Sequence, residues 1–103
     1  MGNERVSAVR LKNHVSHEEK QLETEGVFVA IGYIPDNGLA AGQLKLDKAG
    51  YIVADESCTT GIEGVFVAGD SRVKPLRQII TAASDGAVAA FQAANYLNTH
   101  EDL

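Results

Sequence analysis

Cysteine is almost absent from this chain. Cys58 is the single cysteine among 103 residues, so neither an internal disulfide nor a CxxC pair can form. One thiol fits a reducing compartment, and we expect a cytoplasmic protein. Tryptophan is absent as well, and no apolar run approaches the length that crosses a bilayer. The opening MGNERVSAVR has no apolar stretch after its charges, so it lacks the form of a signal peptide, and no membrane insertion is expected.

Basic residues are in the minority. Nine Lys and Arg stand against 14 Asp and Glu, which gives a formal net charge of −5 and a sequence pI near 5.0. An acidic surface repels phosphate backbones, and Tyr33, Tyr51 and Tyr96 are not arranged as a stacking platform. We therefore expect no nucleic-acid binding. The 45% hydrophobic and 22% charged content is that of an ordinary globular protein, with length enough for one small domain.

The first part of the chain has the pattern of a β-hairpin. In ERVSAVRLKN (residues 4–13) apolar and charged positions alternate, which predicts a strand with one wet face. The polar HVSHEEK predicts a turn, and EKQLETE predicts a second, exposed strand. His14 and His17 lie in this turn with H-x-x-H spacing, but no third ligand accompanies them. We interpret both as solvated residues and expect no metal site.

The pentapeptide GVFVA occurs twice, at residues 26–30 and 64–68. Both copies belong to apolar runs without alternation, which is the pattern of a strand buried on both faces in a parallel sheet. Each run meets a glycine, where a ligand can approach the backbone closely. LKLDKAGYIVAD (residues 44–55) predicts a short hairpin before the second copy. From the residues alone two interpretations stay open: chance recurrence of a good strand sequence, or two equivalent places in a larger fold.

A long helix is predicted over residues 76–98, where apolar positions recur at helical spacing. Pro75 precedes it, at a position where a missing N–H costs little. The helix N-terminus near Gln78 offers unpaired N–H groups and a partial positive charge. Gly86 lies among alanines in its middle, where glycine costs about 1 kcal/mol relative to alanine. We therefore interpret the small residues as a means of close packing against a sheet or a partner.

Three motifs together resemble one family. TGIEGVFVAGD (residues 60–70) has the form T-x-x-x-x-h-F-h-h-G-D, with h apolar. It resembles the second flavin-binding fingerprint of flavoprotein disulfide reductases with two dinucleotide-binding domains. RQIITAASDGAVAA (77–90) resembles the C-terminal helix of low-molecular-weight thioredoxin reductases, and VFVAIGYIPDN (27–37) resembles the segment that ends their NADPH domain. The three motifs occur in the family's order and span nearly the whole chain.

The resemblance implies an α/β fold class. The chain would be a fragment of a Rossmann-like, two-domain FAD/NAD(P)-binding fold, with short β-hairpins, buried parallel-type strands and one long C-terminal helix. Residues 1–34 would be the tail of the NADPH-binding domain, 35–38 a linker, and 39–103 the C-terminal part of the FAD-binding domain. The two GVFVA strands would then occupy equivalent positions in two related domains.

The resemblance also implies a flavin site. Gly69 would leave room for the ribityl chain of FAD, and Asp70 would accept a hydrogen bond from a ribityl hydroxyl. Without the fingerprint, an Asp that caps the following turn is the alternative. Arg77, Gln78 and Ile79 would complete the cofactor-binding set. The helix N-terminus would face the N1–C2=O2 edge of the isoalloxazine ring, where reduction places negative charge. Whether Arg77 pairs with a carboxylate or stays solvated is open at this point.

Two family features do not occur in the chain: a G-x-G-x-x-G phosphate loop and a redox cysteine pair. By resemblance both would precede it. We therefore expect a C-terminal fragment of an NADPH-dependent thioredoxin-disulfide reductase, inactive by itself and without a catalytic residue of its own. Its parent would use NADPH and FAD to reduce a thioredoxin-like disulfide protein.

We also expect the fragment to self-associate, because strands suited to burial would otherwise be exposed. Two alternatives to a thioredoxin reductase fragment remain. One is a fragment of a thioredoxin reductase-like ferredoxin–NADP reductase. The other is a non-catalytic interaction module that pairs with itself or with a partner through strand edges and the alanine-rich helix face.

Overall fold

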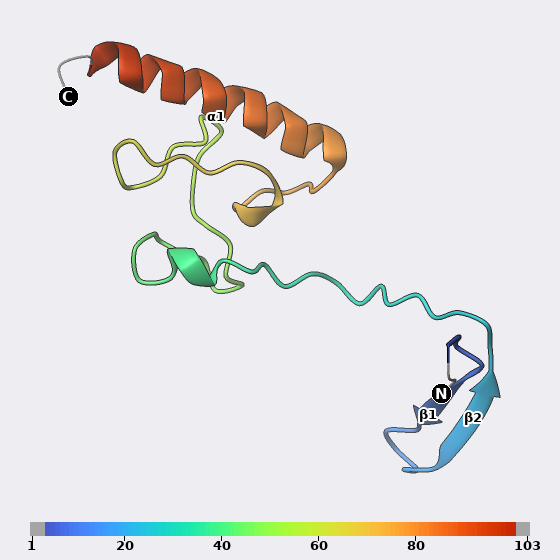
Figure 1. Cartoon of the computed structure of the whole chain (residues 1–103). Coiled ribbons are helices and arrows are strands. Elements are labelled where there is room, and N and C mark those ends of the chain that lie inside the picture. The colour runs from blue at the N-terminus through green and yellow to red at the C-terminus, as the bar shows by residue number, and fades with distance from the viewer. Residues whose placement is uncertain (1–3, 101–103) are drawn as a thin grey trace. The chain divides into compact units, whose positions relative to one another are not determined.

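The computed structural model describes residues 4–100, and the chain divides into two compact units between Gly32 and Tyr33. Two strands belong to the first unit, and two short 3-10 helices and one long helix belong to the second (Figure 1). In chain order the elements are β1 (Ala8–Lys12), β2 (Glu19–Glu23), η1 (Gly38–Ala40), η2 (Gly69–Ser71) and α1 (Ile79–Thr99).

The first unit confirms the predicted hairpin. Strands β1 and β2 pair antiparallel, with Ala8 opposite Glu23 and Lys12 opposite Glu19. Asn13 organises the turn, because its Oδ1 accepts hydrogen bonds from the backbone N–H groups of Val15 at 2.8 Å and Ser16 at 3.0 Å. His17 has a φ of 58°, in the left-handed region that turns use. His14 and His17 therefore lie where the sequence predicts them, and both are exposed.

Neither GVFVA copy forms the buried strand that its apolar run predicts. Residues 27–31 are extended and unpaired, and the Phe28 side chain is 99% exposed. In the second copy, Phe66 forms a single antiparallel bridge to Thr59, and Val67 alone is buried. The prediction is wrong for the described residues for a physical reason: parallel strands are held by ladders to neighbouring strands, and no strand within residues 4–100 pairs with either copy.

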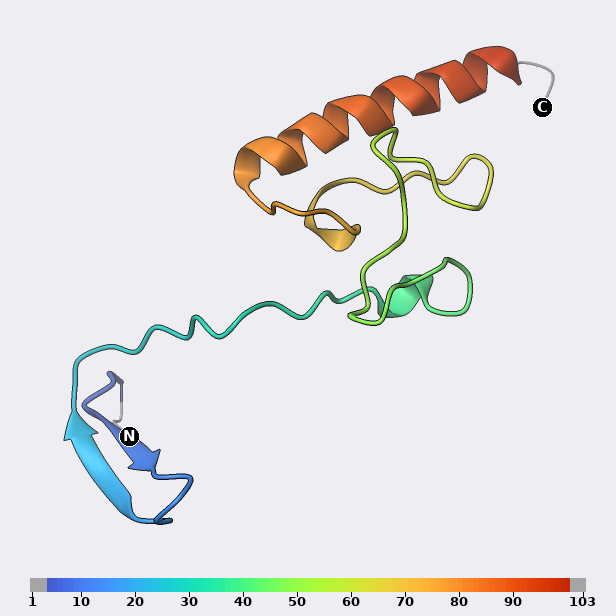
Figure 2. The ribbon, with the colours of Figure 1, turned by 180° about the vertical axis from the view of Figure 1, so that it is seen from behind.

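The second unit consists of loops joined by isolated bridges, and α1 lies along the loops that carry η2 (Figures 1 and 2). Leu46 pairs with Ile52 around a turn in which the Asp47 N–H donates to the Tyr51 carbonyl at 2.8 Å. The hairpin predicted there is thus a turn with one bridge in place of two strands. Ile52 also forms a parallel bridge to Arg72, which brings two distant loops together.

Helix α1 confirms the predicted helix, with a later start. Gln78 is its N-cap in extended conformation, so Pro75 lies outside the helix and not in its first turn. One face of α1 covers the loops and buries Asp85. The outer face stays exposed, and within residues 4–100 no helix has the combination of length and apolar character that a membrane span requires.

Candidate functional site

The η2 turn places the two fingerprint residues at the start of the site. Gly69 is buried with a φ of 78°, a conformation that favours glycine, and an added Cβ would lie 3.6 Å from the Ala82 Cβ of α1. Its N–H donates to Asp85 Oδ2 at 2.9 Å. The backbone conformation alone is therefore a sufficient reason for a glycine here, because 3.6 Å is an ordinary van der Waals distance. Asp70, the next residue, is exposed.

Arg77 is held by partners that the sequence did not indicate. Its guanidinium carbon lies 3.6 Å from the centroid of the Tyr51 ring, an arrangement that gains cation–π attraction. Its Nε donates to the Asp70 carbonyl at 3.3 Å and its Nη2 to the Arg72 carbonyl at 3.2 Å. Among the alternatives left open by the sequence, neither a carboxylate partner nor a solvated side chain is observed. Arg77 bridges the two sides of the η2 turn.

Asp70 and Arg77 line one open hollow of about 260 Å³ in the second unit. Asn37 fastens its rim, because Nδ2 donates to the carbonyls of Gly50 and Ser71, each at 2.9 Å. The other lining residues come from the segment just before η1, from the loop at Tyr51 and from the η2 turn: Tyr33, Ile34, Pro35, Asp36, Asn37, Tyr51 and Ser71. The structure thus brings a carboxylate, a guanidinium and an aromatic ring together at one place.

The N-terminus of α1 follows Arg77 directly. The Gln78 N–H donates to Thr81 Oγ1 at 3.0 Å, so this amide is already engaged, contrary to the expectation that it is unpaired. The amides of Ile79 and Ile80 lie in the first turn, where no intrahelical acceptor exists for them. Both side chains are exposed, at 91% and 76%. The positive end of the helix dipole is therefore accessible at Ile79 and Ile80.

A buried cluster of charged side chains lies behind the η2 turn, and sequence reasoning missed it. Asp85 accepts from Arg72 through Nε at 2.6 Å and Nη2 at 2.9 Å, and from Lys74 Nζ at 2.8 Å. Glu56 reaches the same guanidinium from the surface at 3.3 Å. The hydrogen bonds from Arg72 hold the pKa of Asp85 well below its usual range, and those to Asp85 raise the pKa of Arg72.

A signal for this cluster does exist in the sequence. Asp85 is a lone charged residue in an alanine-rich helix, at helical spacing from Ala82 and Ala89, which face the loops. Gly86, in contrast, faces open space, with nothing within 4 Å of an added Cβ. No described residue therefore packs closely against Gly86, contrary to the prediction, and it is Ala82 that contacts the loops, at Gly69.

Two other features carry no chemistry of their own. Cys58 is fully buried, its Sγ lies 3.6 Å from the Asp85 carbonyl, and burial raises the pKa of its thiol, so it is not an activated nucleophile.

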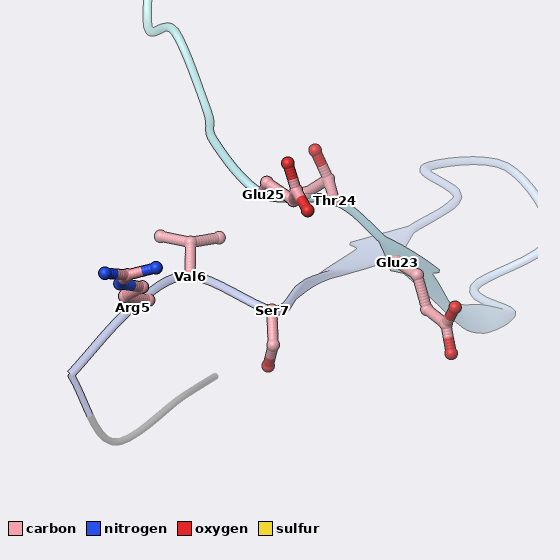
Figure 3. Close-up of a pocket in the computed structure, with 6 residues that line it drawn as sticks. All are labelled: Arg5, Val6, Ser7, Glu23, Thr24 and Glu25. Carbon is pink, nitrogen blue, oxygen red and sulfur yellow. The ribbon is translucent and has the colours of Figure 1, made fainter.

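The hollow at the open end of the hairpin, of about 890 Å³, is larger than the one at Asp70 and Arg77. Figure 3 shows that Val6 and Thr24 point to one side of the backbone while Ser7 and Glu23 point to the other, so its lining does not converge on a ligand. Among residues 4–100 no three His, Cys, Asp or Glu side chains group as a metal site.

Comparison with known proteins places this geometry in context. Residues 2–95 match the pyridine nucleotide-disulphide oxidoreductase family. The chain is 47% identical to the thioredoxin reductase of Treponema pallidum over 98 residues, 95% of this chain and 32% of that protein. It is 53% identical to the thioredoxin reductase of Peptoclostridium acidaminophilum over 77 residues, 75% of this chain and 24% of that protein.

Solved structures agree. The crystal structure of thioredoxin reductase from Streptococcus pyogenes matches with a TM-score of 0.72 at 36% identity, covering 96% of this chain and 33% of that one. The Lactococcus lactis thioredoxin reductase matches with a TM-score of 0.73 at 34% identity, covering 90% and 31%. The predicted fold class is confirmed. The chain spans about a quarter to a third of the length of the relatives it matches.

Proposed function

This chain belongs to the pyridine nucleotide-disulphide oxidoreductase family, and from that membership we propose that it is the C-terminal FAD-binding portion of an NADPH-dependent thioredoxin-disulfide reductase. One observation carries the proposal: Asp70 and Arg77 line one hollow, and the N-cap of α1 directly follows Arg77. Asp70 belongs to the flavin fingerprint, and Arg77 begins the helix motif that follows it. Residues 1–34 would then belong to the NADPH-binding domain and 39–103 to the FAD-binding domain.

The residues at the hollow and at the adjoining start of α1 suit the groups of a flavin. The exposed Asp70 carboxylate accepts hydrogen bonds, as a ribityl hydroxyl requires. The amides of Ile79 and Ile80 point their positive end at whatever lies before the helix, which favours the anionic edge of reduced flavin by about 1 kcal/mol. Gln78 keeps a side-chain amide that can donate to the ring. Gly69 serves the site by letting the chain turn beneath Asp70.

When bound, FAD would supply the hydride and electron transfer chemistry between NADPH and a disulfide of a thioredoxin-like partner. The part assigned to this chain is to bind and orient the flavin: Asp70 holds the sugar alcohol, and the helix N-terminus stabilises charge on the ring. One buried thiol, Cys58, suits a reducing compartment, so we place the protein in the cytoplasm.

A chimera tests the proposal. The region of the Treponema pallidum thioredoxin reductase that aligns with this chain is replaced by this chain, and FAD content and affinity are measured by absorbance and fluorescence titration. Asp70→Asn should weaken FAD binding about tenfold, the loss of one hydrogen bond to a charged acceptor. Glu19→Gln, which removes an equally exposed charge from β2, should leave it unchanged. A chimera without FAD, or equal affinities of both variants, would refute the proposal. The isolated chain should bind FAD weakly, since it contains no phosphate loop.

Self-association is a second candidate function, and the outer face of α1 favours it. Several large apolar side chains on this face are exposed in the described part of the chain: Ile79, Ile80, Phe91 and Leu97, at 65–91%. Apolar groups that lie close together on a surface are typical of protein contact sites. A second copy of the chain would bury this helix face.

A further inference from the structure

All proposed flavin-binding residues lie on one short stretch of chain, residues 69–79, and a single carboxylate behind that stretch holds it at three points. Asp85 Oδ2 accepts from the Gly69 N–H at 2.9 Å, from Arg72 Nε at 2.6 Å and from Lys74 Nζ at 2.8 Å, and Oδ1 accepts from Arg72 Nη2 at 2.9 Å. The side chain is 9% exposed. Water therefore has little access to the Asp85 carboxylate and cannot readily replace these contacts.

We propose that Asp85 is a positioning residue of the flavin site: it holds the backbone N–H of Gly69 and the side chains of Arg72 and Lys74, and thereby places Asp70 and Arg77 at the hollow and the helix N-terminus directly after them. This inference rests on the proposed function. The residues that Asp85 holds lie between and beside those that line the hollow. Asp70 directly follows Gly69, and Arg77 lies beyond Arg72 and Lys74 in the same stretch. Asp85 thus contacts residues of this stretch other than the two, Asp70 and Arg77, that line the hollow.

A continuous chain of contacts carries the effect from Asp85 to the hollow. Asp85 holds the Arg72 guanidinium, and the Arg72 carbonyl accepts from Arg77 Nη2 at 3.2 Å. The Nε of Arg77 donates in turn to the Asp70 carbonyl at 3.3 Å. On the helix side, Lys74 Nζ also donates to the Thr81 carbonyl at 3.3 Å, which ties the loop to the first turn of α1. A shift of Arg72 therefore moves two residues that line the hollow.

Charge gives a second reason. Arg72 and Lys74 are nearly fully buried, at 2% and 5% side-chain exposure. Without the Asp85 charge, the two cations face each other near the positive end of α1, and the loop has to open to hydrate them. Glu56 cannot substitute for Asp85, because it touches only the outer nitrogens of Arg72 and is 87% exposed.

The chimera described above tests this inference with three further variants. Asp85→Asn keeps the shape of the side chain and removes its charge. Lys74→Met removes one of the three fastened points and keeps the Arg72–Asp85 pair, so it decides the question if Asp85→Asn does not fold. Tyr96→Leu is the matched control, because it removes the contact between Tyr96 and Phe66 toward the other end of α1, from a residue outside the fingerprint and the hollow. FAD affinity and the visible circular dichroism of bound flavin are measured well below the melting temperature of every variant.

We expect Asp85→Asn to weaken FAD binding about tenfold and to change the visible dichroism of the flavin. Lys74→Met should change FAD affinity and the visible dichroism in the same direction as Asp85→Asn does, but to a smaller extent. Tyr96→Leu should lower the melting temperature and leave both flavin measurements unchanged. If the folded Asp85 and Lys74 variants bind FAD as the unmodified chimera does, with the same spectrum, the inference is overturned while the proposed function stands. If Tyr96→Leu gives the same flavin changes, Asp85 is merely structural and the inference is overturned. A chimera without FAD overturns both.

Discussion

Arg72 and Asp85 form a two-point ion pair in the interior of the second unit, with Nε donating to Oδ2 at 2.6 Å and Nη2 to Oδ1 at 2.9 Å. Backbone included, the whole Arg72 residue is 1% exposed and the whole Asp85 residue 6%. Buried pairs of this kind contribute little net stability, because desolvation offsets the attraction. Removing one partner is different, since the other is left charged without compensation.

Asp85→Ala should therefore lower the free energy of unfolding of the second unit by about 3–5 kcal/mol. The physical reason is that Arg72 and Lys74 lose their buried acceptor, and the Gly69 N–H loses its partner. Urea unfolding followed by far-ultraviolet circular dichroism of α1 measures the change. Asp70→Ala is the control, because it removes an exposed carboxylate and should change stability by less than about 0.5 kcal/mol. Equal effects of the two substitutions would contradict the prediction.

Acid should destabilise the second unit through the same carboxylate. Hydrogen bonds from Arg72 depress the pKa of Asp85 in the folded chain, so the unfolded chain, with a pKa of about 3.9, binds the proton more tightly. The stability from this group is fully present above the unfolded value and is lost as pH falls below it toward the folded value. The melting temperature should stay level above about pH 5 and fall progressively below about pH 4.

Thermal unfolding at constant ionic strength, across a pH series, provides the measurement. Asp85→Asn should flatten the acid decline. Asp55→Asn is the control: the Ser57 hydroxyl lowers the pKa of Asp55, but this carboxyl is exposed and contributes little. A melting temperature that does not fall between about pH 5 and pH 2 would argue against the assigned role of Asp85.

The sequence predicts the hairpin and the long helix, because each depends on local pattern. Motif spacing singles out Asp70 and Arg77, which line one hollow, while their role toward a flavin stays a prediction. The buried charge cluster was not predicted. Arg72 and Asp85 are 13 residues apart, and nothing local indicates that a loop folds back to place them together. Tyr51 was missed for the same reason, since Arg77 reaches its ring from another loop.

The GVFVA runs were misjudged for a different reason. An apolar run shows that a segment is suited to a buried strand, but burial needs neighbouring strands to complete the ladder. Phe28 is 99% exposed, although its run has the pattern of a central strand. The composition of a segment indicates whether it suits a buried strand. Whether it pairs as one depends on which neighbouring strands are present.

Gly64→Ala should destabilise the second unit by about 1–2 kcal/mol, because Gly64 has a φ of 77° where a side chain costs energy. An added Cβ would also lie 3.2 Å from the Tyr96 ring, which packs on Phe66 and His100. Gly61→Ala, three residues earlier, is the matched control, since nothing lies within 4 Å and its φ is not positive. Thermal melting of both variants decides the matter. A Gly64 variant as stable as the Gly61 variant would show that this turn can relax.

Self-association through α1 should be visible in the isolated chain. Phe91 is 65% exposed on the outer face of the helix, and burying such a side chain contributes about 1.5–3 kcal/mol. We expect the unmodified chain to sediment as a dimer or larger species. Phe91→Glu should weaken this association about tenfold or more, because a charge replaces the apolar contact. Gln43→Glu adds the same charge away from α1, on an exposed residue next to η1, and should leave the sedimentation unchanged.

A monomeric unmodified chain over the accessible concentration range would disprove self-association. Equal dissociation of both variants would instead assign it to net charge, since each adds one negative charge to a chain that already carries −5.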